Sequence, residues 1–190
     1  METIYSKIFD NVKREIAKAD DEQLKSDLYK EELRDEYSIE SPELQKDLLS
    51  VEIKSKTLTD NNAPEGFDYH EGDVVNYAYY GIPIKGDHNL LKHKIESLLQ
   101  ASNKFAIVKG FLFIEEYYFE KIEDNNTAIE AVKAAMLKDV AFIEQYIEEV
   151  NIEVENFKIT LQNEINTEIA IEIDKRRIKQ ETIDKLNPFD

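Results

Sequence analysis

The sequence contains no cysteine among its 190 residues. This absence excludes a disulfide framework, a thiolate metal site and a cysteine nucleophile. No apolar run reaches the roughly 18 residues that a membrane-spanning helix needs. Basic side chains are scarce: 24 lysines and arginines stand against 41 acidic residues, which gives a net charge of −17. A surface of this sign argues against a general nucleic-acid binder. We therefore expect an acidic, thiol-free, cytoplasmic protein with no membrane contact.

Glycine and proline are also rare, and their positions divide the chain. All 5 glycines lie between Gly66 and Gly110, and no proline occurs between Pro83 and Pro188. Turns therefore concentrate in the middle third, and the two acidic flanks are typical of helices. This distribution predicts an α+β fold, with N-terminal helices, a small antiparallel sheet and a long C-terminal helix or helical hairpin. We place an α+β domain at 1–125 and a helical segment, the expected oligomerisation element, at 126–186.

The spacing of apolar residues predicts the individual elements. Apolar residues recur every four positions over about 3–19, as in an amphipathic helix. A second, weaker helix follows over about 24–33, and Ser41-Pro42-Glu43 is typical of the start of a short helical turn. Alternation and β-branched or aromatic residues predict strands within 51–57, 74–84 and 105–119. Their short connections favour antiparallel pairing.

The last third carries the strongest pattern. Thr127 and Glu130 form a capping box at the start of a helix. From there apolar residues follow at steps of three or four with a mean of about 3.64, close to the period of a straight α-helix. We call these twelve positions the C-terminal stripe: Ile129, Val132, Met136, Val140, Ile143, Ile147, Val150, Val154, Phe157, Leu161, Ile165 and Ile169.

One uninterrupted helix over 128–180 would be about 80 Å long at ~1.5 Å per residue. A domain of this size is too small to cover such a stripe. Either the helix pairs with a second copy, or it breaks near Asn151 or Asn163 and folds back as a hairpin. Because the stripe stays in phase through Asn151, we favour a homodimer with the C-terminal stripe as its interface.

A tyrosine-rich strand and the turn after it form a candidate partner surface. Tyrosine is frequent at interface centres because its ring is apolar and its hydroxyl can still form hydrogen bonds. The same residues serve equally well in a core. The residues of this candidate surface are Tyr77, Tyr79, Tyr80, Lys85, Asp87 and His88.

Catalytic and metal-binding patterns are weak, and we predict no catalytic residue, metal or cofactor. The alternative is a metal-dependent enzyme whose Asp68–Asp87 loops supply Asp68, His70, Asp73, Asp87 and His88, but these lack the spacing of a structural zinc site. The strand-borne Glu52-Ile53-Lys54 has the Glu-x-Lys pattern of a nuclease core, in which two carboxylates hold Mg²⁺. The second carboxylate would have to come from Asp35 or Asp47.

Two charge features remain. Ten acidic residues and one basic residue lie between Asp139 and Asp174, typical of a solvated helix face. The functional alternative is an acidic DNA mimic or inhibitor that binds a basic partner. The dense basic cluster Lys175, Arg176, Arg177 and Lys179 suits the C-terminal end of a helix dipole. It is also the one place where we expect a local contact with phosphate.

The segment Tyr80-Gly81-Ile82-Pro83-Ile84-Lys85-Gly86-Asp87, together with the helix end Arg176-Arg177-Ile178-Lys179, resembles a bacterial multidomain family. Members carry a Tyr-x-Ile-Pro-Phe-x-Gly-Asp segment and an Arg-Arg-x-Lys helix end, and a restriction-endonuclease-like (PD-(D/E)XK-associated) domain follows in phage-defence proteins. The family's proline after this segment is replaced by Ile95, and the nuclease half is missing.

The resemblance implies a sensing, positioning or assembly module without cutting activity. Together with the residue patterns, it predicts a non-catalytic binding module that self-associates through its C-terminal helix. A protein partner or a downstream effector domain fits this prediction.

Overall fold

The computed structural model describes residues 2–63, 66–101, 104–118 and 120–187. The fold is α+β, as predicted, with 59% helix and 19% strand. The helices are α1 (Glu2–Lys18), α2 (Asp27–Tyr37), α3 (His88–Lys94), α4 (Glu96–Ala101) and α5 (Asn126–Leu186). The strands are β1 (Glu43–Leu44), β2 (Ser50–Thr57), β3 (Val74–Lys85), β4 (Phe105–Val108) and β5 (Phe111–Tyr118), and short 3₁₀ turns cover Gln23–Lys25 and Lys46–Leu48. Among the described residues, no helix is both long and apolar enough to cross a membrane.

The chain forms two compact units that do not follow the predicted boundary at residue 125. Unit 1 combines Met1–Ile39 with Glu153–Asp190, and unit 2 is Glu40–Ile152. Helix α5 contributes its first part to unit 2 and its second part to unit 1. The predicted helical segment at 126–186 is α5 (Asn126–Leu186), and each part of this helix packs against other segments of the chain.

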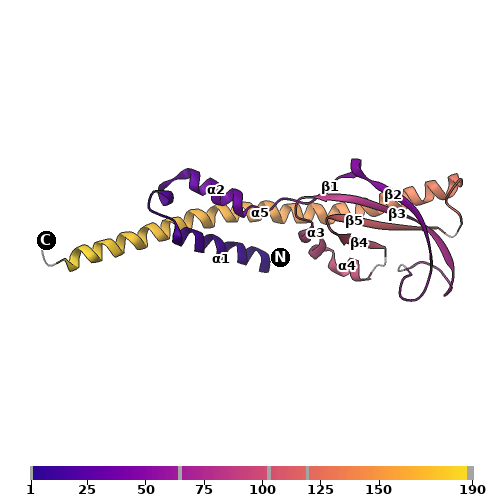
Figure 1. Cartoon of the computed structure of the whole chain (residues 1–190), viewed down its shortest axis with the longest axis horizontal. Coiled ribbons are helices and arrows are strands. Elements are labelled where there is room, and N and C mark those ends of the chain that lie inside the picture. The colour runs from indigo at the N-terminus through magenta and orange to yellow at the C-terminus, as the bar shows by residue number, and fades with distance from the viewer. Residues whose placement is uncertain (1, 64–65, 102–103, 119, 188–190) are drawn as a thin grey trace. The chain divides into compact units, whose positions relative to one another are not determined.

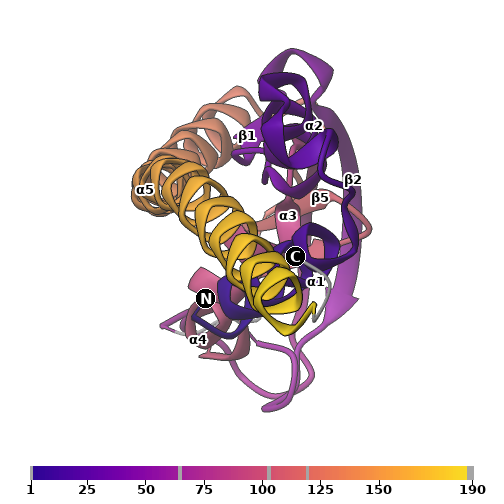
Figure 2. The same ribbon diagram turned by 90° about the vertical axis from the view of Figure 1, so that its left-hand side faces the viewer.

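In unit 1, α1 and α2 lie beside the second part of α5, as both views show (Figures 1 and 2). The ring of Phe157 on α5 stacks on Tyr5 with their centres 4.5 Å apart, and Phe9 of α1 lies 5.5 Å from the same ring. Lys13 of α1 pairs with Glu168 of α5 at 2.9 Å. These contacts join segments that are more than a hundred residues apart in the sequence.

Unit 2 is built on a five-stranded antiparallel sheet. The strand order is β1-β3-β5-β4, and β2 also pairs with β3. The β4–β5 hairpin turns through Lys109 and Gly110, with φ of 50° and 78°. Positive φ at both central residues is the signature of a type I′ turn, which matches the twist of the strands it joins.

Helices α3, α4 and α5 pack against one face of this sheet, the core face. Its side chains include Tyr80, Ile82, Leu112 and Ile114, all buried. They meet Leu91 of α3 and Ile143 of α5 in one continuous apolar cluster. Helices α3 and α4 were not predicted, because helices of 7 and 6 residues are too short to show a recognisable apolar periodicity.

The C-terminal stripe is buried within its own chain, which makes the predicted need for a second copy wrong. Residues from Val132 to Ile169 along the stripe are each at most 8% exposed, and Ile129 is partly buried. The first part of the stripe lies in the core cluster of unit 2, and the second part lies in unit 1 beside α1 and α2. Helix α5 shows no break at Asn151 or Asn163. A continuous helix thus needs neither a hairpin nor a partner to cover its stripe.

Local chemistry explains two smaller differences from the predictions. The side chain of Asn125, not of Thr127, accepts a hydrogen bond from the Ala128 amide at 3.1 Å and caps α5. Asparagine is among the strongest N-cap residues, so the helix starts two residues earlier than the capping box indicates. The predicted helical turn at Ser41-Pro42-Glu43 is instead extended, because Glu43 and Leu44 pair with the end of β3.

Candidate interaction surface on the open face of the sheet

The helices of unit 2 leave one face of the sheet without a covering helix among the described residues. From Ala78 to Ile84 on β3 the even-numbered residues point to the core face, and the odd-numbered ones point the other way. We call this second side the open face. Its main residues are Glu52, Lys54, Lys56, Tyr77, Tyr79, Pro83, Lys85, Phe111, Phe113, Glu115 and Tyr117. The β2–β3 connection covers one end of it, where Phe67 lies 5.5 Å from Tyr117.

Aromatic rings dominate the open face. Tyr77 of β3 stacks on its cross-strand partner Tyr117 with their centres 5.5 Å apart. Tyr79 stacks on Phe113 at 5.0 Å, and Phe113 stacks on Phe111 at 5.9 Å. Cross-strand aromatic pairs of this kind stabilise a sheet by about 0.5–1.5 kcal/mol beyond the area they bury. The result is a rigid, ordered array of rings, of which Phe111 is still 39% exposed.

Gly81 makes the stack between Tyr79 and Phe113 possible. Gly81 is the direct cross-strand partner of Phe113. A Cβ atom on Gly81 would lie 3.1 Å from Cε1 of the Phe113 ring and 2.8 Å from the Ser50 hydroxyl oxygen. The missing side chain lets the Phe113 ring cross β3 toward Tyr79. A glycine inside a strand is therefore part of how this surface is built.

Two lysines of β2 lie over these rings. Nζ of Lys54 is 3.8 Å from the centre of the Tyr79 ring, and Nζ of Lys56 is 4.7 Å from the centre of the Tyr117 ring. Cation–π attraction at partly exposed sites contributes about 0.5–1 kcal/mol. Each lysine also pairs with a carboxylate, Lys54 with Glu52 at 2.8 Å and Lys56 with Glu115 at 2.8 Å.

The open face keeps its phenol groups neutral. Burial raises the pKa values of Tyr77 and Tyr79 above the ordinary value. The pKa of Tyr117 is raised further, first by burial and then because its hydroxyl donates a hydrogen bond to Glu115. Tyr77 and Tyr79 therefore present apolar rings with uncharged hydroxyl groups at any physiological pH.

The structure divides the six residues of the predicted partner surface. Tyr77, Tyr79 and Lys85 lie on the open face, although the Tyr77 side chain is itself buried, with 9% exposed. Tyr80 points to the core face and is 7% exposed, so its assignment to a partner surface is wrong. Strand alternation turns neighbouring residues to opposite sides, and both sides of β3 carry aromatic or aliphatic residues.

The last two predicted residues belong to the turn after β3. Asp87 accepts a hydrogen bond from the Asn89 amide at 3.0 Å and caps α3, and His88 is the first residue of that helix. The prediction missed Phe111, Phe113 and Tyr117 of β5. Their signal is an alternation of aromatic residues at odd-numbered positions, in register with the odd-numbered residues of β3.

A partly buried charge cluster lies on the other side of the sheet, with Glu116 as its most buried member. The Lys104 ammonium is 2.8 Å from Glu116 of β5 and 2.5 Å from Asp139 of α5. Burial raises the pKa of Glu116 to about 7. The hydrogen bond with Lys104 lowers this pKa, and the hydrogen bond with Asp139 raises it. Burial lowers the pKa of Lys104, but hydrogen bonds with both carboxyl groups outweigh it and the net direction is upward. The cluster links β5 to α5 inside the unit.

The loop residues proposed for a metal-dependent enzyme make local contacts instead. Asp73 accepts a hydrogen bond from the His70 amide at 2.7 Å, and Asp87 is the cap of α3. Within the described ranges, no group of three or more histidine, aspartate or glutamate side chains is arranged to hold a metal ion. Glu52 and Lys54 of the nuclease-like pattern pair with each other on the open face.

Ion pairs within the chain occupy most of the acidic run on α5. Its carboxylates pair with Lys104, Lys46, Lys94, Lys158, Lys13, Lys175, Arg176 and Arg177. In the basic cluster, Arg176 also pairs with Asp21 at 2.8 Å and Arg177 also pairs with Glu181 at 2.5 Å. Because these charges are paired within the chain, fewer carboxylates of the acidic run are available to mimic DNA, and fewer cations of the basic cluster are available to bind phosphate.

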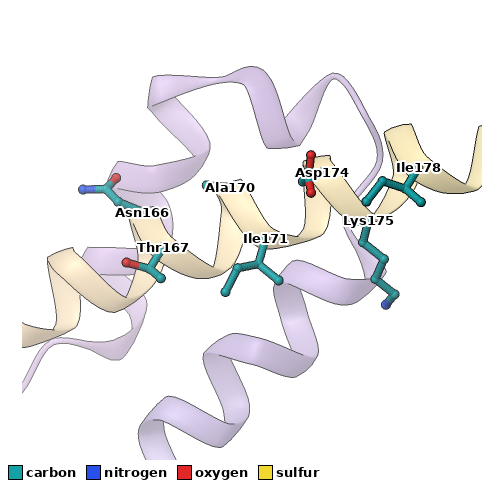
Figure 3. Close-up of a pocket in the computed structure, with 7 residues that line it drawn as sticks. All are labelled: Asn166, Thr167, Ala170, Ile171, Asp174, Lys175 and Ile178. Atoms are coloured by element: carbon teal, nitrogen blue, oxygen red, sulfur yellow. The ribbon is translucent and has the colours of Figure 1, made fainter.

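A second exposed region lies in unit 1, on the C-terminal part of α5. A hollow of about 800 Å³ is lined by seven residues of this one helix: Asn166, Thr167, Ala170, Ile171, Asp174, Lys175 and Ile178 (Figure 3). Ile171 and Ile178 are 53% and 50% exposed. A hollow with a single helix as its wall is an open surface, and it brings no reactive groups together.

Comparison with protein-family models, with curated proteins and with solved structures gave no match. The segment that resembles phage-defence proteins has a structural explanation here. Tyr80, Ile82 and Ile84 fill the core, Gly86 turns with a φ of 79°, and Asp87 caps α3. A short motif whose residues end a strand and start a helix carries little information about activity.

Proposed function

We propose that the protein is a non-catalytic protein-binding module whose contact surface is the open face of the sheet. One observation carries the proposal: a row of stacked rings on β3 and β5 lies on a sheet face that α3, α4 and α5 leave uncovered. Rigid aromatic side chains lose little conformational entropy on binding and dominate the energetic centres of protein interfaces.

The chemistry of the face indicates its ligand. The centre is apolar, from Tyr79 through Phe113 to Phe111, and Lys54, Lys56 and Lys85 lie around it. We propose a partner segment that presents aliphatic or aromatic side chains to the rings and carboxylates to the lysines. Single-stranded nucleic acid also stacks on aromatic rings, but a net charge of −17 opposes phosphate binding.

The resemblance to phage-defence proteins supplies a proposed setting. In that setting the module binds a protein partner or a downstream effector and does not itself cut nucleic acid. Self-association through the C-terminal stripe is no longer part of the proposal, because unit 1 and unit 2 bury that stripe themselves.

Two phenylalanines form a matched pair for the test. Phe111 on the open face is 39% exposed and contacts one ring, Phe113. Phe142 on α5 is 40% exposed and also contacts one ring, Tyr146. The variants F111A and F142A therefore remove the same side chain at the same exposure, and they differ in whether the open face is touched.

The test is selection of peptides from a random display library against the wild-type protein. Each enriched peptide is then titrated against wild type, F111A and F142A by fluorescence anisotropy. We expect F111A to weaken binding about tenfold or more and F142A to leave it unchanged. Enriched peptides that bind F111A as tightly as wild type would contradict the proposal. Binding of a labelled oligothymidylate that F111A abolishes would show that the ligand class is nucleic acid instead.

A further inference from the structure

The outer edge of β2 is a second surface, which adjoins the open face. Strand β2 pairs with β3 on one side and, among the described residues, with no strand on the other. It is eight residues long, against four for β4 at the opposite edge of the sheet. Val51 and Ile53 on it are 56% and 45% exposed. A long edge strand with unpaired backbone groups readily pairs with another strand.

The hydrogen bonds of β3 determine which groups of β2 point outward. The Leu58 amide donates to the Asp73 carbonyl oxygen at 2.8 Å, in the register that continues the β2–β3 ladder. Hydrogen-bonded and non-hydrogen-bonded residue pairs alternate along an antiparallel ladder. Because Leu58 belongs to a hydrogen-bonded pair, the even-numbered residues of β2 direct their backbone N–H and C=O groups to β3. The backbone N–H and C=O groups of Val51, Ile53 and Ser55 therefore face the free edge.

The charges of β2 favour one way of filling this edge. Glu52 and Lys54 flank Ile53, and both side chains lie on the open face. If two copies of β2 pair antiparallel about a two-fold axis at Ile53, Glu52 of each copy lies opposite Lys54 of the other. A shift of the axis to Glu52 or to Lys54 places two identical charges opposite each other, which destabilises the pair.

We propose that the free edge of β2 binds the same edge of a second copy of this chain, antiparallel and centred on Ile53. Val51 then lies opposite Ser55 of the second copy, and the outward backbone groups form about six hydrogen bonds across the interface. The contact is isologous, as in most homodimers. The two-fold axis is perpendicular to the sheet, so the two open faces become one continuous surface.

Charge reversal tests both the contact and its register. E52K and K54E each place like charges opposite each other twice, once on each side of the axis. We expect each to raise the dimer dissociation constant about tenfold or more, measured by sedimentation equilibrium. The double variant E52K/K54E restores opposite charges and should dimerise like the wild type. All four proteins should have the same far-ultraviolet circular dichroism, since both side chains are on the surface.

The absence of cysteine allows a second, geometric test. In I53C the two new thiols lie across the axis at a Cα separation of about 5.5 Å, within disulfide reach. In S55C the two thiols are about four residues apart along the strands, or ~13 Å, and cannot join. We expect I53C to cross-link under mild oxidation and S55C to stay uncross-linked.

Three results would overturn the proposal. The first is a wild-type protein that sediments at 22.2 kDa at every concentration up to the millimolar range. The second is a dimer that E52K does not weaken or that E52K/K54E does not restore. The third is equal cross-linking of I53C and S55C. F111A does not change the β2 edge. The dimer of this variant therefore tests the edge proposal, and its peptide binding separately tests the proposed function.

Discussion

Replacing Glu116 with glutamine should stabilise the protein at pH 8 and leave its stability unchanged at pH 4. Glu116 is 3% exposed, and its carboxyl group pairs with the Lys104 ammonium, which also pairs with Asp139. Two carboxylates and one ammonium in a buried site leave an uncompensated negative charge. The folded protein removes that charge by keeping the Glu116 proton.

The size of the effect follows from the two pKa values. The Glu116 carboxyl group has an ordinary pKa of 4.5 in the unfolded chain and a pKa of about 7 in the folded protein. Below pH 4.5 both states hold the proton, and the carboxyl group contributes its full stability. Between pH 4.5 and 7 only the unfolded chain releases it, so the free energy of unfolding falls by up to about 1.4 kcal/mol per pH unit. The total loss is at most ~3 kcal/mol and is complete above pH 7.

Glutamine imitates the protonated form of Glu116 at every pH. Its oxygen accepts from the Lys104 ammonium, and its amide group donates to the Asp139 carboxylate. We therefore expect the stability difference between E116Q and wild type to be near zero at pH 4 and to grow to about 2–3 kcal/mol at pH 8. Urea unfolding followed by tyrosine fluorescence at a series of pH values measures it. The difference between the two proteins cancels the contribution of the other carboxyl groups.

A direct titration provides the control. The side-chain carbon resonance of Glu116 should titrate with a midpoint near 7 in the wild type, and with a lower midpoint in D139N, because the hydrogen bond with Asp139 raises that pKa. A midpoint near 4.5 in the wild type, or an E116Q variant that is less stable at pH 8, would refute the reasoning.

Two further predictions concern packing and backbone conformation, and urea unfolding measures both. Phe157 is 4% exposed, so F157A should lower the free energy of unfolding by about 3–5 kcal/mol. Ile159 on the same helix is 63% exposed, and I159A should change the free energy of unfolding by about 0.5 kcal/mol or less. Equal effects of the two variants would show that α1 does not pack on this part of α5. Gly86 and Gly72 both have positive φ, 79° and 95°, but only at Gly86 would a Cβ atom overlap the backbone of Ser41. G72A should therefore cost about 1 kcal/mol, and G86A clearly more, and an equal loss in the two variants would count against the close approach at Gly86.

The periodicity of the sequence was enough to predict the elements that carry it. Helix α5, the N-terminal helix and the strands β2, β3 and β5 lie where steps of 3.6 or 2 residues place them, because burial of one side imposes that period on the sequence. The same alternation held the information for most of the candidate site. Odd-numbered aromatic residues on β3 and β5 must share a face once the two strands pair in register.

Periodicity shows that a side of an element is buried, but it does not show what buries it. The C-terminal stripe is covered by α1 and α2 in unit 1 and by the sheet in unit 2, segments brought to it by contacts distant in the sequence. Nothing in the local pattern distinguishes such cover from a second copy of the chain.

The sequence also could not show which of Tyr79 and Tyr80 faces the core, because it does not show which side of the strand is covered. Both neighbours are aromatic on a strand that is apolar on both sides, so either could face the core. Helix α5 decided it by packing on the side of Tyr80, which left Tyr79 with the rings of the open face. Which side of a sheet receives the helices depends on the path of the whole chain, and only the tertiary structure contains that path.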